Sequence, residues 1–146
     1  KMPARIGPWA VDHANNRLVV VAGQIVHRID LATGKFTPPP DGFLGTVRPA
    51  ITPDGKLAAV GDSAGVIRTY AAPFTGEPKT LRAGGAAVDD VLFSPDGKTL
   101  FAAHADRTIG VWDLASGREA ATLKPPAPPA EKSAWFQTPK LAVSPD

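Results

Sequence analysis

The stretch FSPDGKTLFAAHADRTIGVWD, residues 93–113, decides the fold of this chain. A tight turn over residues 94–98 separates two runs of strand-forming residues, and a second polar turn at residues 105–107 leads to a third run that ends in Trp112 and Asp113. An Asp-Gly turn flanked by apolar runs is a strong hairpin signal. The stretch therefore predicts three consecutive antiparallel strands.

The same pattern recurs along the chain. The turn at Asp54 repeats at Asp96, 42 positions later. Glycines that follow a Thr or Ser keep step with it, at Gly34, Gly76 and Gly117. A period of about 40–45 residues is that of a four-stranded propeller blade. The repeat therefore predicts a series of similar blades.

The phase of the repeat places twelve strands in three blades. We expect them near residues 6–11, 17–22, 25–30 and 35–37, then 46–51, 56–61, 66–70 and 79–81, and then 88–93, 99–103, 108–113 and 119–123, with one more near 140–143. Runs such as residues 18–22 are apolar on both faces, which indicates sheets covered on both sides. No helical pattern intervenes. The fold class expected is all-β, an incomplete β-propeller of four-stranded antiparallel blades.

Residues 92–100 and 108–114 resemble the WD40 repeat, with the turn, Asp106 and the Trp112-Asp113 pair in phase. Repeats one and two diverge, with Ile29-Asp30 and Tyr70-Ala71 in the Trp-Asp position. The resemblance implies a single partial propeller over residues 1–146. Its blades would span about 5–40, 45–82 and 86–124, followed by a Pro-rich loop at 124–137 and the first strand of a fourth blade at 138–146.

One departure from the WD40 pattern concerns a hydrogen-bond network. The family often carries a Gly-His pair before the first strand, and its histidine bonds the aspartate of the second hairpin turn. Here Gly84-Gly85 stands in that place. We therefore expect Asp106 to cap its own turn. The landmark residues have structural roles in this interpretation: Asp54, Asp96, Asp106, Trp112, Asp113, Gly34, Gly76 and Gly117.

Three blades and one strand do not close a ring, since propellers typically have four to eight blades. Our hypothesis is that the chain is a piece of a longer propeller, or that copies combine to close one. The partners expected are thus further blades, of this or another chain, and other proteins.

Composition and residue pattern argue against several function classes. The net charge is +2 with basic residues scattered singly, which argues against nucleic-acid binding, and no apolar run approaches the length of a membrane span. There is no cysteine, which leaves the compartment open, with the cytoplasm favoured. His13, His27 and His104 fall at different points of the repeat. We expect no catalytic residue, cofactor or metal.

Binding is expected on the irregular face, where the loops between second and third strands and between blades gather. The candidate partner-binding residues are Phe43, Leu44, Arg82, Arg107, Trp135 and Phe136. Trp135 and Phe136 follow a Pro-rich run that could act as a spacer. The alternative is that these two aromatic residues fold back on the neighbouring blade.

The function expected from the resemblance is a non-enzymatic protein-interaction scaffold. One alternative is a ligand-binding or enzymatic propeller, which would need polar groups recurring near each first strand. Arg5, Arg48, Asp89 and Asp90 stand there and form no coherent set. A regulatory domain of a larger, bacterial multidomain protein is a further alternative.

Overall fold

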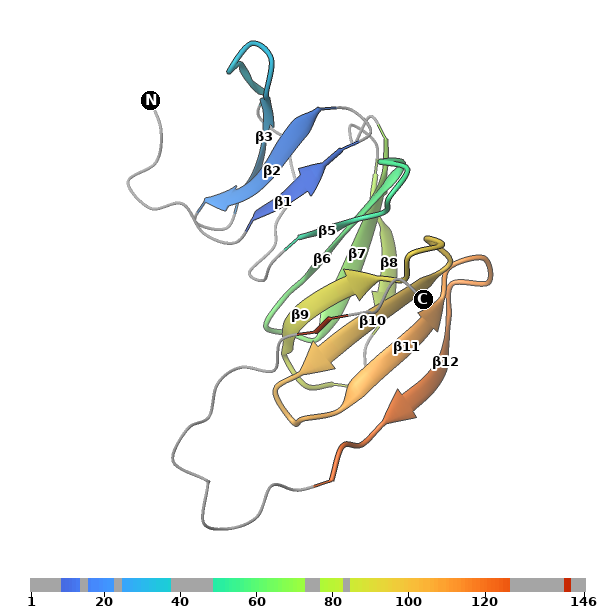
Figure 1. Ribbon diagram of the computed structural model, residues 1–146. Coiled ribbons are helices and arrows are strands. Elements are labelled where there is room, and N and C mark those ends of the chain that lie inside the picture. The colour runs from blue at the N-terminus through green and yellow to red at the C-terminus, as the bar shows by residue number, and fades with distance from the viewer. Residues whose placement is uncertain are drawn as a thin grey trace.

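The computed structural model describes residues 9–13, 16–22, 25–37, 49–72, 77–82, 85–126 and 141–142, and twelve strands lie within them. The strands are short and form three groups, drawn in blue, green and yellow to orange in Figure 1. They are β1 (Trp9–Asp12), β2 (Arg17–Ala22), β3 (Ile25–Asp30), β4 (Phe36–Thr37), β5 (Ala50–Ile51), β6 (Leu57–Gly61), β7 (Val66–Ala71), β8 (Lys79–Arg82), β9 (Val88–Phe93), β10 (Thr99–His104), β11 (Ile109–Asp113) and β12 (Arg118–Leu123).

Each group is a four-stranded antiparallel sheet in which sequence neighbours pair: blade 1 (β1–β4), blade 2 (β5–β8) and blade 3 (β9–β12). The expected all-β class and incomplete propeller are confirmed. The strand at residues 46–51 is shorter than expected in the described part, where β5 holds Ala50–Ile51. Residues 46–48, like 6–8 before β1, lie outside the described residues.

The blades stack face to face, and the core consists of the two layers between them. Between blades 1 and 2 lie Val19, Ala58, Val60 and Tyr70. Among the described side chains, the layer between blades 2 and 3 contains Ala50, Ala59, Ile67, Leu81, Val88, Val91, Phe93, Leu100, Ala102 and Trp112. Burial of this apolar surface is the main favourable contribution to folding.

Strand β6 shows why the strands are apolar on both faces. Successive side chains of a strand point to opposite sides, so Ala58 and Val60 belong to the layer against blade 1, whereas Ala59 belongs to the layer against blade 3. All three are buried because blade 2 is the middle layer. By contrast, every residue of β12, the outermost strand of blade 3, is exposed.

The chain reaches blade 3 again after the Pro-rich segment. The N–H of Leu141 donates a hydrogen bond of 3.1 Å to the Oδ2 of Asp90, which is buried on β9. Residues 141–142 therefore lie beside the first strand of blade 3. The rest of the predicted fourth-blade strand, 138–140 and 143–146, is outside the described residues. Within the described ranges, no helix is long and apolar enough to cross a membrane.

Candidate functional site

The loops at one end of blades 2 and 3 form a continuous rim, which we call the irregular end: residues 62–66, 85–88 and 104–108, with the exit from β12 at 123–126. Backbone hydrogen bonds join them. The N–H of Val88 donates to the carbonyl of Asp62 at 3.1 Å, and the N–H of Ala105 donates to the carbonyl of Ala87 at 2.9 Å. The pairing of Ile109 with Leu123 brings the exit from β12 beside the 104–108 turn. Four segments that are separate in sequence thus share one surface.

The turn of blade 3 is held by a chain of side-chain hydrogen bonds. Asp106 accepts from the backbone N–H of Thr108 at 3.0 Å and from its hydroxyl at 2.6 Å. The expectation that Asp106 caps its own turn is confirmed. Because the single hydroxyl proton of Thr108 goes to the carboxylate, its oxygen must accept from Nδ1–H of His104, 3.0 Å away. These hydrogen bonds therefore require that Nδ1 of His104 carries a proton.

His104 extends this chain into the core. It is 2% exposed, and its ring meets the ring of Trp112 edge-on, with centroids 6.0 Å apart. Its Nε2 is buried and has no hydrogen-bond partner in the part of the chain that the structure describes. The network thus runs from Asp106 through Thr108 to His104 and Trp112 within one blade. Sequence reasoning missed it, although His104 stands two residues before the turn aspartate and could have been tested as a partner.

Arg107 lies at the exposed tip of the same turn with φ of 71°, a left-handed conformation. Its N–H donates to the carbonyl of His104 at 2.9 Å and closes the turn. Lys124, exposed at the exit from β12, is near enough for its charge to help lower the pKa of Asp106, although the hydrogen bonds from Thr108 are the larger cause. Arg107 and Lys124 form no ion pair with any described residue.

Blade 2 holds the equivalent turn by a different chemistry. The Oδ1 of Asp62 accepts from the backbone N–H groups of Ala64 and Val66 at 2.9 and 3.0 Å. Its Oδ2 accepts from Nη1 of Arg68 at 2.6 Å in a half-buried ion pair. Burial raises the pKa of Asp62, but the hydrogen bond from Arg68 and those from the backbone outweigh it and leave this pKa below its usual range.

The structure describes only part of the predicted binding set. Arg107 lies on the irregular end, and the backbone of Arg82 lies at the same end, where it pairs with Val66. Phe43, Leu44, Trp135 and Phe136 lie outside the described residues, as does the landmark Gly76. The remaining landmarks are in the tight turns, in the 104–108 turn or, like Trp112, in the core.

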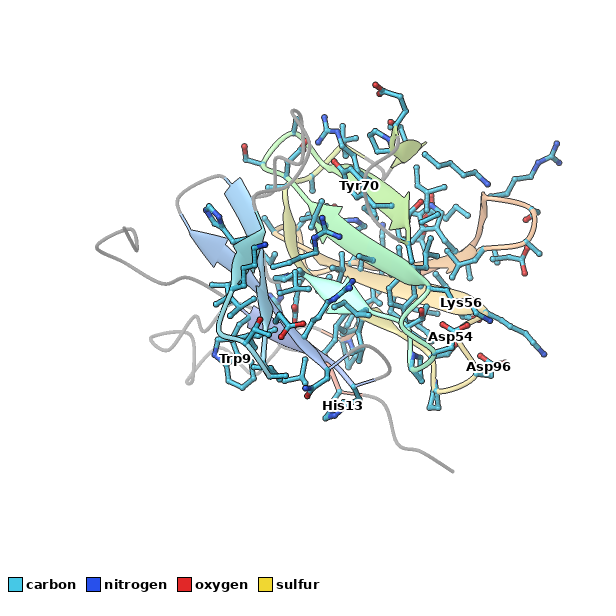
Figure 2. The ribbon with its side chains drawn as sticks, turned by 90° about the horizontal axis from the view of Figure 1, so that it is seen from above. Trp9, His13, Asp54, Lys56, Tyr70 and Asp96 are labelled. Carbon is cyan, nitrogen blue, oxygen red and sulfur yellow. The ribbon has the colours of Figure 1, made fainter. Side chains whose placement is uncertain are left out.

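The opposite end of the blades carries the tight turns, and two of its aspartates pair with a neighbouring lysine. Asp54 and Asp96 each accept a hydrogen bond from a hydroxyl two residues earlier, that of Thr52 or Ser94, and each lies within 4 Å of a lysine, Lys56 or Lys98. Figure 2 shows Asp54, Lys56 and Asp96 gathered at one edge of the molecule, away from Tyr70. These residues complete turns, as the sequence predicts.

A cavity of about 460 Å³ lies along the first strands of the blades. Trp9, Ile51 and Phe93 are among the apolar residues that line it, and Asp90 contributes a carboxylate. The two oxygens of Asp90 accept from the N–H of Val91 and of Leu141, each at 3.1 Å. No group of three potential metal ligands was found among the described residues. The cavity could accept an apolar side chain, and its described lining residues include no set of groups arranged for catalysis.

Comparison with known proteins agrees with this geometry. The profile of the WD40 family (WD domain, G-beta repeat) matches residues 77–113. Two similar solved structures are titled "Structure of U3-55K", with 21% identity and a TM-score of 0.71, and "Crystal structure of RRP9 WD40 repeats", with 23% identity and a TM-score of 0.70.

Both alignments cover 82% of this chain but only 39% and 38% of the two neighbours, so the chain spans well under half the length of these proteins. No curated protein matches the sequence. At these identities the likeness to the solved structures shows the fold. Residues 77–113 thus match the WD40 repeat, and they lie within the three four-stranded blades of an incomplete β-propeller.

Proposed function

We propose that this chain is a protein-interaction segment of a WD40-type propeller, without enzymatic activity, and that partners bind at the irregular end. The observation that carries the proposal is the continuity of that end: hydrogen bonds join the 62–66 turn to the 85–88 connector and the connector to the 104–108 turn. Loops held in place by a rigid scaffold are the usual location of binding residues.

We also propose that further blades complete the ring, as the blade limits expected from the sequence imply. Support comes from Leu141, whose N–H meets Asp90 on β9 and directs the chain to the position where a fourth blade would start. The half-buried side chains of Leu92, Phe101 and Val111 would then be covered by that blade. Whether further blades belong to this chain or to a second copy decides the oligomeric state.

The absence of cysteine permits a direct test of the irregular end. Single cysteines are placed at Ala64 and Ala105 on the irregular end, and at Ala32 and Ala115 in exposed tight turns on the opposite end. Each variant is labelled with a photoactivatable benzophenone, irradiated in an extract of the source cells and analysed by mass spectrometry. We expect the same cross-linked protein from Ala64→Cys and Ala105→Cys and none from the other two. Equal cross-linking from both ends would contradict the proposal.

The axial cavity favours a second candidate, the binding of an apolar ligand. Its walls include the side chain of Trp9, which is 57% exposed, beside Ile51 and Phe93. Ligand pockets are typically apolar with a few polar groups, and among the described lining residues Asp90 is the one that carries a charge. Quenching of tryptophan fluorescence by small apolar compounds, lost in Trp9→Ala, would support this function over the first.

A further inference from the structure

We propose that the irregular end of blades 2 and 3 binds an acidic segment of a protein partner, with Arg107 as the residue that selects negative charge. The inference rests on the proposed function and adds the chemistry of the partner. Two features support it: the backbone conformation of Arg107 compared with its equivalent in blade 2, and the exposed charge of Arg107, which has no ion pair among the described residues.

Arg107 occupies a position where the backbone favours glycine. Its equivalent in blade 2, 42 positions earlier, is Gly65, with φ of 77° against 71° for Arg107. Both residues close their turn by donating an N–H to the carbonyl three positions before. A residue other than glycine rarely adopts this backbone conformation, because its Cβ crowds the backbone.

The two positions differ in what a side chain would meet. A Cβ at Gly65 would lie 2.5 Å from the carbonyl oxygen of Ala86, so blade 2 requires glycine there. At position 107 the side chain is exposed and directed to solvent. The guanidinium of Arg107 thus contributes no described contact that offsets its backbone conformation. A residue held in an unfavourable conformation without a packing reason points to a binding role.

The charge of Arg107 indicates the sign of the ligand. At the irregular end, Asp62 pairs with Arg68, and Asp106 keeps its charge with Lys124 near it. Arg107 is exposed and forms no ion pair with any described residue. The backbone of Arg82, the repeat equivalent of Lys124, lies at the same end.

The surface fits an acidic peptide better than a nucleic acid. A nucleic-acid footprint is a stripe of many basic residues, because affinity comes from neutralising successive phosphates. Here two exposed cations, Arg107 and Lys124, lie near Asp106, whose carboxylate would repel a continuous line of phosphates. Carboxylates spaced along a flexible peptide can pair with Arg107 and Lys124 and avoid Asp106. Arginine is also suited to a carboxylate because its two N–H groups can bind both oxygens.

The test uses the full chain and a fluorescein-labelled peptide of alternating Glu and Gly, with the Gln-Gly peptide as the neutral control, followed by fluorescence anisotropy at low salt. Four variants are compared: Arg107→Gly, Arg107→Gln, Lys124→Gln and, as the matched control at the opposite end, the exposed Arg118→Gln. Loss of one exposed ion pair is expected to weaken binding about fivefold for the Arg107 variants and about twofold for Lys124→Gln. Arg118→Gln should bind as the wild type does.

Thermal unfolding gives a second and independent measurement. Glycine suits the backbone at position 107, so Arg107→Gly should raise Tm by about 2–4 °C while it weakens binding. A loss of affinity in a protein that has become more stable cannot be ascribed to misfolding. Glutamine at position 107 has the same unfavourable backbone conformation as arginine, so Arg107→Gln should leave Tm within about 1 °C of the wild type.

Several results would overturn the inference. They are no binding of the Glu-Gly peptide at millimolar concentration, equal binding of the Gln-Gly peptide, equal weakening by Arg118→Gln, a lowered Tm in Arg107→Gly, or tighter Arg107-dependent binding of oligouridylate than of the peptide. The photocrosslinking experiment separates the two proposals. The Ala105→Cys change is therefore also made in the Arg107→Gly variant. If this double variant still cross-links the same partner, the irregular end is an interface, but Arg107 does not select its ligand.

Discussion

Blades 2 and 3 use different residues to hold the same turn. In blade 3 a hydrogen-bond chain runs from Asp106 through Thr108 to His104, which lies against Trp112. In blade 2 the equivalent positions are Ala64, Val66, Asp62 and Tyr70. There Asp62 caps the turn and pairs with Arg68, whose equivalent in blade 3 is Gly110.

Whether a blade has arginine or glycine at this position depends on the size of its aromatic ring. A Cβ at Gly110 would collide with the six-membered ring of Trp112, so the larger ring needs a glycine two residues before it. Tyr70 has Arg68 at that position, and the arginine pairs with Asp62. The comparison teaches that a divergent repeat can keep its backbone if a whole group of contacting residues is replaced together.

The largest expected effect comes from removing the aromatic ring of blade 3. Trp112→Ala should cost about 3–5 kcal/mol of unfolding free energy, because Trp112 is 1% exposed in the core layer between blades 2 and 3. The matched change in blade 2, Tyr70→Ala, should cost less, since the ring is smaller. Urea denaturation followed by circular dichroism measures both. If Tyr70→Ala lost more unfolding free energy than Trp112→Ala, the expected order of the two aromatic residues would be wrong.

Alanine at the position two residues before each ring should be destabilising for opposite reasons. Gly110→Ala adds a methyl group against Trp112 and should cost about 1–3 kcal/mol. Arg68→Ala removes a half-buried ion pair and should cost about 1–2 kcal/mol.

The pH dependence of stability distinguishes these two variants. The pKa of Asp62 is lowered in the folded state, so the contribution of the ion pair is present above the unfolded pKa and is lost as pH falls through the folded value. The difference between wild type and Arg68→Ala should therefore shrink below about pH 4. The difference for Gly110→Ala should stay constant, and a parallel decrease there would contradict the steric explanation.

Thr108→Val tests the hydrogen-bond chain of blade 3 with little change of shape, because blade 2 already has Val66 at this position. We expect a loss of about 1 kcal/mol, as His104 and Asp106 each lose a partner. Thr108 lowers the pKa of Asp106, so the loss should be largest above the unfolded pKa and should fade as pH decreases through the folded value. Thr122→Val on the exposed β12 is the control and should stay within about 0.5 kcal/mol.

The smallest difference is expected at the tight turns. Thr52→Ala should cost about 1 kcal/mol and Ser94→Ala about 0.5 kcal/mol, because Thr52 is 6% exposed whereas Ser94 is only half-buried. Both hydroxyls donate to the turn aspartate and accept from a backbone N–H five residues on. Thermal melts of the two variants and their double mutant measure the pair. If the two variants lost equal stability, the burial of Thr52 would add nothing to the stability of its turn.

The sequence by itself determined the blade repeat, the tight turns and the capping role of Asp106, because turn chemistry acts between residues two to five positions apart. It also identified Arg107 as a candidate, since a charged residue at a hairpin tip is exposed by its position alone.

Only the tertiary structure decided which polar residues enter the core. His104 is buried because blade 2 covers its sheet, Asp62 joins the next blade through Val88, and Asp90 meets Leu141 across 51 positions of sequence. Such contacts leave no local pattern, because they depend on how the blades stack and not on the period of any strand. The role that we propose for Arg107 likewise rests on a comparison of its φ with that of Gly65.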